Sequence, residues 1–209
     1  MSPAHVHEPT YAAIKQRLLA GEWPPGSRLE SARIADETGV SMTPVRDSLN
    51  RLVGERLVDL QPGFGFHVPH LGALELRELL DLNLALLRMA IRKVNRPIPL
   101  QVCTDAADAA DAALKTAWLF SAIARSCGNQ ALEDAIDALN SRLHALRRTE
   151  HKVLSDTGSE LQFLEDTCKL RKLRELEPAL RHYHTRRSRA APQLLAVFEH
   201  TATDRRPGA

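Results

Sequence analysis

Cysteine is scarce in this sequence, aromatic residues make up only 4% of it, and no long apolar run is present. The three cysteines, Cys103, Cys127 and Cys168, are widely spaced and form no Cys-x-x-Cys pair. This pattern excludes a disulfide framework and a cysteine-based zinc site, so we interpret them as buried thiols. No stretch of about 18 uncharged apolar residues could span a membrane, and the N-terminus lacks the pattern of a secretory signal. We therefore expect a cytoplasmic protein.

An excess of either charge is also lacking. The 209 residues contain 28 Lys and Arg against 26 Asp and Glu, which gives a net charge of +2. Within residues 1–70, seven basic and eight acidic side chains leave a balance of −1. Such a balance neither requires nor excludes a nucleic-acid partner. Any argument for DNA binding must rest on where particular side chains lie.

The first third of the chain has the pattern of three helices with a tight turn between the second and the third. Apolar spacing predicts a helix over residues 10–20 and a second helix that begins at Ser31. Gly39 permits the positive φ of a tight connection, and Ser41 offers its hydroxyl as an N-cap for a third helix over residues 43–55. This order predicts a helix-turn-helix.

The third helix has a buried and an exposed side, and a hairpin follows it. Helical spacing turns Val45, Leu49 and Leu52 inward and leaves a slender polar side that suits a major groove. Two short β-prone runs then flank a Pro- and Gly-containing turn, which predicts a hairpin. A helix-turn-helix followed by a hairpin is a winged helix. Gly63 at the tip would let its backbone N–H approach a phosphate or a minor groove.

After residues 68–73 the sequence becomes rich in Leu, Ala and Arg with helical periodicity. Breaks at residues 95–99 and 127–129 divide it, which predicts an all-α bundle of about five or six helices. Within it we interpret Trp118 and Phe120 as core residues. The fold class is therefore mainly α, with an N-terminal winged helix-turn-helix followed by an all-α helical bundle. The predicted segments are a flexible N-terminus (1–8), the winged helix-turn-helix (9–69), a linker (70–75) and the helical domain (76–207).

Three ordered stretches resemble the N-terminal pattern of the GntR family of bacterial transcription regulators. They are Pro25–Leu29, then Ile34–Ala35 with Gly39–Leu52, and then Leu57–Val58 with Pro62–Val68. The resemblance implies DNA contacts at the start of the third helix and at the hairpin tip, with Arg46 reading bases because a guanidinium can bond guanine O6 and N7 together. Met42 departs from the arginine usual in the family, and Ala32 stands where some members have a contacting arginine, with Arg33 beside it. The implied DNA-binding residues are Arg33, Ser41, Met42, Thr43, Pro44, Arg46, Asn50 and Gly63.

The helical part resembles the effector-binding and dimerisation domain of the FadR-type GntR regulators. That subfamily commonly holds a divalent metal with one aspartate and three histidines, but the first two of those positions are Ala117 and Ser121 here. His151 and His184 each match a later histidine, in different alignments, and either alignment leaves one ligand. We therefore predict no metal and no other cofactor. The effector-binding candidates implied by position are Asn83, which aligns with an arginine of the family, and Ser121, His151 and His184.

The leading hypothesis is a sequence-specific transcription regulator, which the resemblance implies to be a repressor. We expect a homodimer on a double-stranded, near-palindromic operator, because one winged helix reads only a few base pairs, and a small-molecule effector would alter the spacing of the two DNA-binding domains. One alternative is a regulator without ligand control that binds a protein partner. The other is an enzyme with a base drawn from His151 and Glu150 or from His184 and Glu177. No catalytic motif supports the enzyme.

Overall fold

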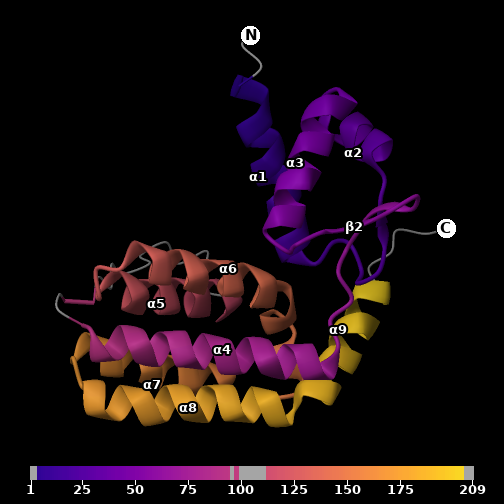
Figure 1. The fold of residues 1–209 in the computed structure, drawn as a ribbon. Helices are drawn as coiled ribbons and strands as arrows, with labels where there is room; N and C mark the ends of the chain where they lie inside the picture. The colour runs from indigo at the N-terminus through magenta and orange to yellow at the C-terminus, as the bar shows by residue number, and fades with distance from the viewer. Residues whose placement is uncertain (1–3, 95–96, 99–111, 205–209) are drawn as a thin grey trace. The chain divides into compact units, whose positions relative to one another are not determined.

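The computed structural model describes residues 4–94, 97–98 and 112–204, and the chain divides into two compact units (Figure 1). The N-terminal unit contains the described residues up to Leu71 and those from Glu199 onward. The helical unit runs from Gly72 to Phe198. None of the helices in the described ranges is both long enough and apolar enough to cross a membrane.

Three helices build most of the N-terminal unit: α1 (Ala4–Ala20), α2 (Ser31–Thr38) and α3 (Met42–Gly54). The first begins at Ala4, earlier than the start near residue 9 that the sequence predicts. Pro9 lies inside this helix. The carboxylate of Glu8 accepts a hydrogen bond from Arg51 Nη1 of α3 at 2.9 Å, which ties the added turn to the rest of the unit.

The turn between α2 and α3 is the predicted one. Gly39 adopts φ 67° and ψ 27°, and its N–H faces the carbonyl oxygens of Ala35 and Asp36 at the end of α2. Ser41 is the N-cap of α3 with φ −72° and ψ 164°, but its side chain makes no capping hydrogen bond. The position of the cap is therefore confirmed, whereas the hydroxyl is not used by the helix.

A three-stranded antiparallel sheet follows in the order β1-β3-β2, with strands β1 (Arg28–Leu29), β2 (Asp59–Gln61) and β3 (Gly65–His67). The hairpin of β2 and β3 is the predicted wing. Strand β2 begins at Asp59, two residues after the start of the β-prone run that the sequence shows over residues 57–60. The sequence did not predict β1, because two residues are too short to show alternation.

The core of the N-terminal unit lies between α1, α2 and α3. Val45, Leu49 and Leu52 are fully buried, as the helical spacing predicts, and they pack against Ile14 of α1. Trp23 closes this core, and the guanidinium of Arg17 lies 4.3 Å from the centre of its ring. The hydrophobic core therefore holds α3 in place, with its other side exposed.

The helical unit is an all-α bundle, as predicted. A 3-10 helix, η2, connects α6 to α7, and Asn129 caps α6 by accepting a hydrogen bond from the Leu132 N–H at 3.1 Å. Helix α4 begins inside the predicted linker, and the predicted break at 95–99 lies mostly outside the described residues. The elements are α4 (Ala73–Arg92), α5 (Ala112–Arg125), α6 (Gln130–Arg147), η2 (Glu150–Lys152), α7 (Thr157–Lys169), α8 (Leu173–Arg189) and the first part of α9 (Ala191–Asp204), whose residues from Glu199 onward belong to the N-terminal unit.

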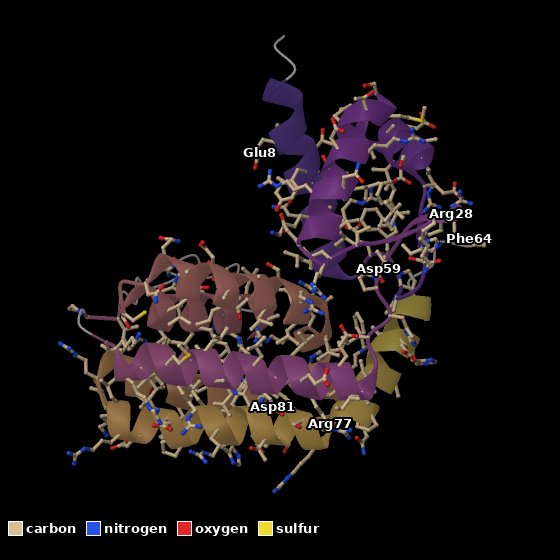
Figure 2. All side chains as sticks on the ribbon, in the orientation of Figure 1. Glu8, Arg28, Asp59, Phe64, Arg77 and Asp81 are labelled. Carbon is tan, nitrogen blue, oxygen red and sulfur yellow. The ribbon has the colours of Figure 1, made fainter. Side chains whose placement is uncertain are left out.

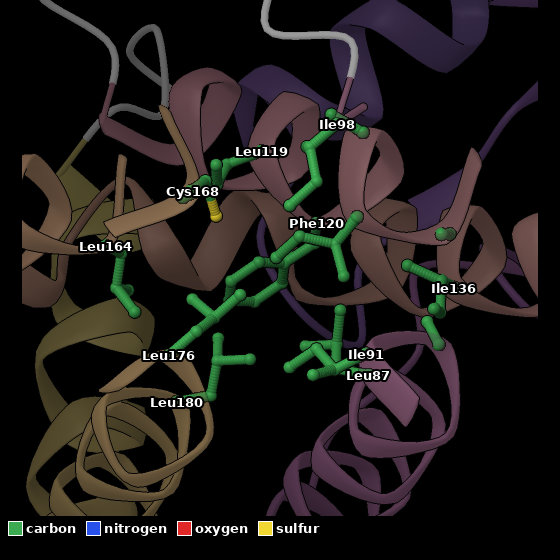
Figure 3. Packing of buried hydrophobic residues seen from close by; sticks show 14 of the residues in the cluster. Leu87, Ile91, Ile98, Leu119, Phe120, Ile136, Leu164, Cys168, Leu176 and Leu180 are labelled. Carbon is green, nitrogen blue, oxygen red and sulfur yellow. The ribbon is translucent and has the colours of Figure 1, made fainter. Parts of the chain in front are cut away.

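Phe120 of α5 lies at the centre of the core of the helical unit, among side chains from α4 and α8 (Figure 3). It is fully buried, and Trp118 packs against the same cluster while remaining partly exposed. Both are core residues, as expected. Cys127 and Cys168 are buried free thiols, and burial raises the pKa of Cys168 to about 12. Cys103 lies outside the described residues.

Candidate nucleic-acid interface and a buried polar cluster

The exposed side of α3 carries most of the predicted DNA-binding residues. Helix α3 buries its apolar positions, so the residues between them face the solvent. Pro44 is the exception, because its side chain is buried in the first turn of α3 and does not reach this surface. The exposed residues are Ser41, Met42, Thr43, Arg46 and Asn50, and we call them the α3 surface.

Arg46 makes no hydrogen bond or ion pair with any residue that the structure describes. Arg28 and Arg56 are likewise exposed and unpaired among the described residues, but they lie outside the α3 surface. Three other arginines of the N-terminal unit are engaged with carboxylates: Arg17, Arg33 and Arg51. Arg51 bonds Glu8 and lies 3.6 Å from the centre of the Tyr11 ring, and Arg33 lies 3.6 Å from the Glu37 carboxylate. All N–H donors of the Arg46 guanidinium are therefore available to a partner outside the unit. Arg33, by contrast, is already paired with Glu37 within α2.

A hydrogen-bonded clamp fixes α3 against α1. Glu55 accepts a hydrogen bond from Tyr11 Oη at 2.6 Å and one from Lys15 Nζ at 2.7 Å. Burial acts to raise the pKa of Glu55, but the hydrogen bonds from Lys15 and Tyr11 outweigh it and lower that pKa. The carboxylate therefore stays ionised and holds the end of α3 that lies away from Ser41.

The wing presents backbone and an aromatic ring. Gly63 has φ 78°, with nothing within 4 Å of where a Cβ would stand, so its backbone is open to a partner. The next residue, Phe64, is 67% exposed and lies at the outer edge of the unit (Figure 2). Sequence analysis did not single out Phe64. The available signal was an aromatic residue between two glycines in a chain with few aromatics.

In the helical unit, two of the four effector-binding candidates meet in the interior. His184 Nε2 lies 2.9 Å from Asn83 Oδ1, and His184 Nδ1 lies 2.7 Å from the Leu180 carbonyl oxygen. Burial lowers the pKa of His184 to about 3, against a smaller opposing effect of the Leu180 hydrogen bond. The imidazole is therefore neutral at physiological pH.

The third candidate, Ser121, belongs to a chain of hydrogen bonds that ends on an arginine. Ser121 Oγ bonds the Asp137 carboxylate and accepts from Asn140 Nδ2 at 3.2 Å. Asn140 Oδ1 in turn accepts from Arg147 Nη1 at 3.0 Å. Sequence analysis missed Arg147, although it shares the buried side of α6 with Ile136, and that spacing could have identified it.

The structure does not bring His151 into this cluster, because the residue is exposed on η2. The enzyme alternative also loses its two proposed pairs. Glu150 is buried against Arg187, at 2.9 Å from its Nε, while His151 faces the solvent. Glu177 bonds Arg88 Nε at 2.7 Å, and His184 contacts Asn83 instead. Among the described residues, no group of three His, Cys, Asp or Glu side chains is placed to hold a metal ion.

The sequence is similar to known bacterial regulators. Residues 7–68 match the family described as bacterial regulatory proteins, gntR family. The chain is 36% identical over 78 residues to the HTH-type transcriptional regulator McbR of Escherichia coli (strain K12), a match that covers 37% of this chain and 35% of that relative. It is 29% identical over 105 residues to an uncharacterized HTH-type transcriptional regulator from the TAR-I ttuE-ttuC' intergenic region of Agrobacterium vitis, over 49% of this chain and 61% of that relative.

Solved structures share the fold over nearly the whole chain. A protein described as a transcriptional regulator GntR from Rhodococcus sp. RHA1 superposes with a TM-score of 0.70 at 16% identity, covering 91% of this chain and 97% of that one. E. coli McbR/YncC superposes with a TM-score of 0.62 at 19% identity, covering 90% and 97%. At such identities the likeness shows the fold alone. The sequence matches, by contrast, span about a third to three fifths of the curated relatives.

Proposed function

We propose that this chain, whose residues 7–68 form a helix-turn-helix domain of the gntR family of bacterial regulatory proteins, is a sequence-specific DNA-binding transcription regulator. One observation carries the proposal above the others. Arg46 stands exposed on the α3 surface, about one helical turn after the start of α3, with no partner among the described residues. The two relatives described above are both named as transcriptional regulators.

The proposed contacts follow from the chemistry of each side chain. Helix α3 enters the major groove, where the Arg46 fork donates two hydrogen bonds to O6 and N7 of one guanine. The hydroxyls of Ser41 and Thr43 bond phosphates, since Ser41 makes no capping hydrogen bond in α3. Gly63 places its backbone N–H against a phosphate or in the minor groove.

Met42 and Phe64 add apolar contacts to this proposed interface. Met42 is 50% exposed and its thioether carries no charge, so it adds contact with the methyl group of a thymine rather than a bond to phosphate. Phe64 at the wing tip is placed to lie against sugar or to wedge at a base step. We therefore expect operator binding to release fewer counterions than it would with an arginine at position 42.

The same proposal includes the oligomeric state of the protein and its role as a repressor. A single α3 surface covers only a few base pairs, so a homodimer on a near-palindromic operator supplies the affinity that one copy lacks. The protein acts in the cytoplasm as a repressor, and the helical unit dimerises and takes a small-molecule effector that shifts DNA affinity.

The test is binding of the full chain to a labelled fragment of its own upstream DNA, against a scrambled fragment, by fluorescence anisotropy over a salt series. We expect tight binding to the upstream fragment alone and a linear fall of log affinity with log salt. Replacing Arg46 with alanine should cost about 1 to 3 kcal/mol of specific binding and leave the melting temperature unchanged.

Arg125→Ala is the matched control, because it removes the same charge from α5 of the helical unit, where Arg125 lies 3.6 Å from the Glu133 carboxylate. This variant should bind the upstream fragment like the wild type. Equal loss in both variants, or unchanged discrimination in Arg46→Ala, would overturn the assignment of Arg46 to base contact.

A further inference from the structure

The tip of the wing holds one aromatic side chain on a fixed backbone. The Phe64 N–H donates to the Gln61 carbonyl oxygen at 3.0 Å, and this bond closes the turn between β2 and β3. Pro62 and Gly63 occupy the two central positions of the turn, and the glycine has φ 78°, a combination typical of a type II turn. On the other side of Phe64, Gly65 pairs with Gln61 across the hairpin. The position of Phe64 is therefore set before any partner binds.

The ring projects from a tip that is otherwise slender. Phe64 is 67% exposed at the outer edge of the unit (Figure 2). Both of its neighbours in the chain are glycines, so the residues on either side of it add no side chain to the width of the tip. The minor groove of B-DNA is about 6 Å wide, little more than the spacing of about 4.8 Å between two paired strands. This tip is therefore the part of the hairpin that can enter such a groove.

A cation lies beside the tip. Arg28 of β1 pairs with His67 of β3, and its exposed side chain reaches toward the end of the hairpin. The Arg28 Nε lies 3.9 Å from the point where Gly65 would carry a Cβ, next to Phe64 in the chain. In the described ranges Arg28 makes no hydrogen bond or ion pair. The one carboxylate in this row of the sheet, that of Asp59, stands on the far strand at the base of the wing.

An exposed ring in a minor groove can lie along a sugar or enter between two base pairs. A ring along a sugar leaves one of its faces in water, whereas a ring between base pairs buries both faces at the cost of unstacking them. The fixed backbone around Phe64 favours the second mode, because little conformational freedom remains to be lost on binding. Arg28 supports it as well, since a phosphate bound beside the ring sets the register of the ring on the duplex.

We propose that Phe64 is a wedge that opens one base step from the minor groove and bends the operator, while Arg28 holds a phosphate next to the opened step. This inference rests on the proposed function and names the feature of the DNA that the wing selects. Pyrimidine–purine steps, TA and CA/TG, are the most easily kinked and unstacked. The wing therefore selects such a step where it reaches the DNA, so the operator is read partly by its deformability and not only by the base contact of Arg46.

The experiment measures unstacking and bending separately from affinity. The upstream fragment is first narrowed by footprinting to the sequence that the full chain protects. Adenines of that duplex are then replaced one at a time by 2-aminopurine, whose fluorescence rises when the base loses a stacking neighbour. We expect a rise at one pyrimidine–purine step in each half-site and greater resonance energy transfer between dyes on the two DNA ends. Exchanging that step for a purine–pyrimidine step should weaken binding at least fivefold.

Variants of the wing assign the two signals. Phe64→Ala should abolish both and weaken binding at least tenfold, without a change in melting temperature because the ring is exposed. Phe64→Leu keeps an apolar wedge and should keep the bend. Arg28→Gln should reduce the salt slope of log affinity by about one and leave the bend in the complex unchanged. The matched control is Phe163→Ala, which removes a 52% exposed ring from α7 of the helical unit and should match the wild type throughout.

The outcomes separate this inference from the proposed function. Selective binding of the upstream fragment with no 2-aminopurine signal, or with a bend that persists in Phe64→Ala, contradicts the wedge and leaves the proposed function standing. A loss of affinity in Phe64→Ala without any change in the bend assigns the ring to sugar contact instead. If the full chain shows no preference for the upstream fragment over scrambled DNA and unstacks no base in either, both the proposed function and the wedge are wrong.

Discussion

At the scale of single residues, Arg187 is the buried charge whose loss should do most damage. Its removal leaves the carboxylates of Glu150 and Glu160 without the cation that they share. Breaking a buried ion pair from one side costs about 3 to 5 kcal/mol. We expect Arg187→Met to lower the free energy of unfolding by that amount in urea titrations of the full chain. Arg181→Met is the control, because Arg181 is largely exposed and lies 3.7 Å from Glu177, and its change should stay within about 1 kcal/mol.

His184 should make the helical unit sensitive to mild acid. Burial holds the folded-state pKa of His184 near 3, below the ordinary histidine value of 6.5, so between these values the unfolded chain binds more protons. Stability should therefore fall as the pH drops from 6.5, by about 2 kcal/mol between pH 7.5 and pH 5.

The free energy of unfolding of the wild type and of His184→Gln should be compared over that pH range. The two carboxylates with lowered pKa values, Glu55 and Glu177, do not interfere, because their ordinary pKa is 4.5 and their contribution to stability is lost only at lower pH. The variant should show a flatter dependence. Equal slopes in the two proteins would mean that His184 takes up its proton in the folded state.

Individual site residues were predictable where position along a helix decided exposure. Helical spacing placed Arg46 outside and Val45 inside, and the structure agrees. Pro44, which the family resemblance implies as a DNA contact, is buried in α3, and the resemblance alone does not reveal that burial. Arg147 was missed because a buried arginine is rare, and only contacts between α6 and its neighbours reveal which of its donors have partners.

At the scale of elements, the turn before α3 depends on the one glycine that it contains. Gly39 has φ 67°, and nothing lies within 4 Å of its added Cβ, so the cost of a side chain there is backbone strain alone. We expect Gly39→Ala to lower the free energy of unfolding by about 1 kcal/mol, measured by urea titration.

Gly54 provides the opposite control in the same unit. It ends α3 with an ordinary helical φ, and its added Cβ would also meet nothing within 4 Å. Alanine there should stabilise the protein by about 0.5 to 1 kcal/mol. If both alanine variants moved stability in the same direction, backbone conformation could not be the cause.

The long elements were predictable because helices of the bundle repeat their apolar residues at 3.6-residue spacing. The ends of the elements were less predictable. The sequence placed the start of α1 near Pro9, but the contact between Glu8 and Arg51 joins residues 43 positions apart, and no local pattern contains it. Strand β1 depends likewise on its pairing with β3.

At the scale of the whole molecule, the two units have separate cores that share no residue. Leu49 is fully buried in the core of the N-terminal unit. Leu49→Ala should therefore destabilise that unit by about 2 to 5 kcal/mol and weaken DNA binding. Differential scanning calorimetry should still show the unfolding transition of the helical unit at its wild-type temperature. A shift of both transitions in this variant would mean that the units do not fold independently.

The two tryptophans are divided between the two cores, and this gives each unit its own optical signal. Trp23 lies under Arg17 in the N-terminal unit, and Trp118 packs at the edge of the Phe120 cluster in the helical unit. The sequence contains no third tryptophan. Emission from Trp118→Phe therefore reports on the surroundings of Trp23 alone, and emission from Trp23→Phe on those of Trp118. A single chain thus supplies two built-in fluorophores that distinguish an event at the wing-bearing unit from one in the bundle without any attached dye.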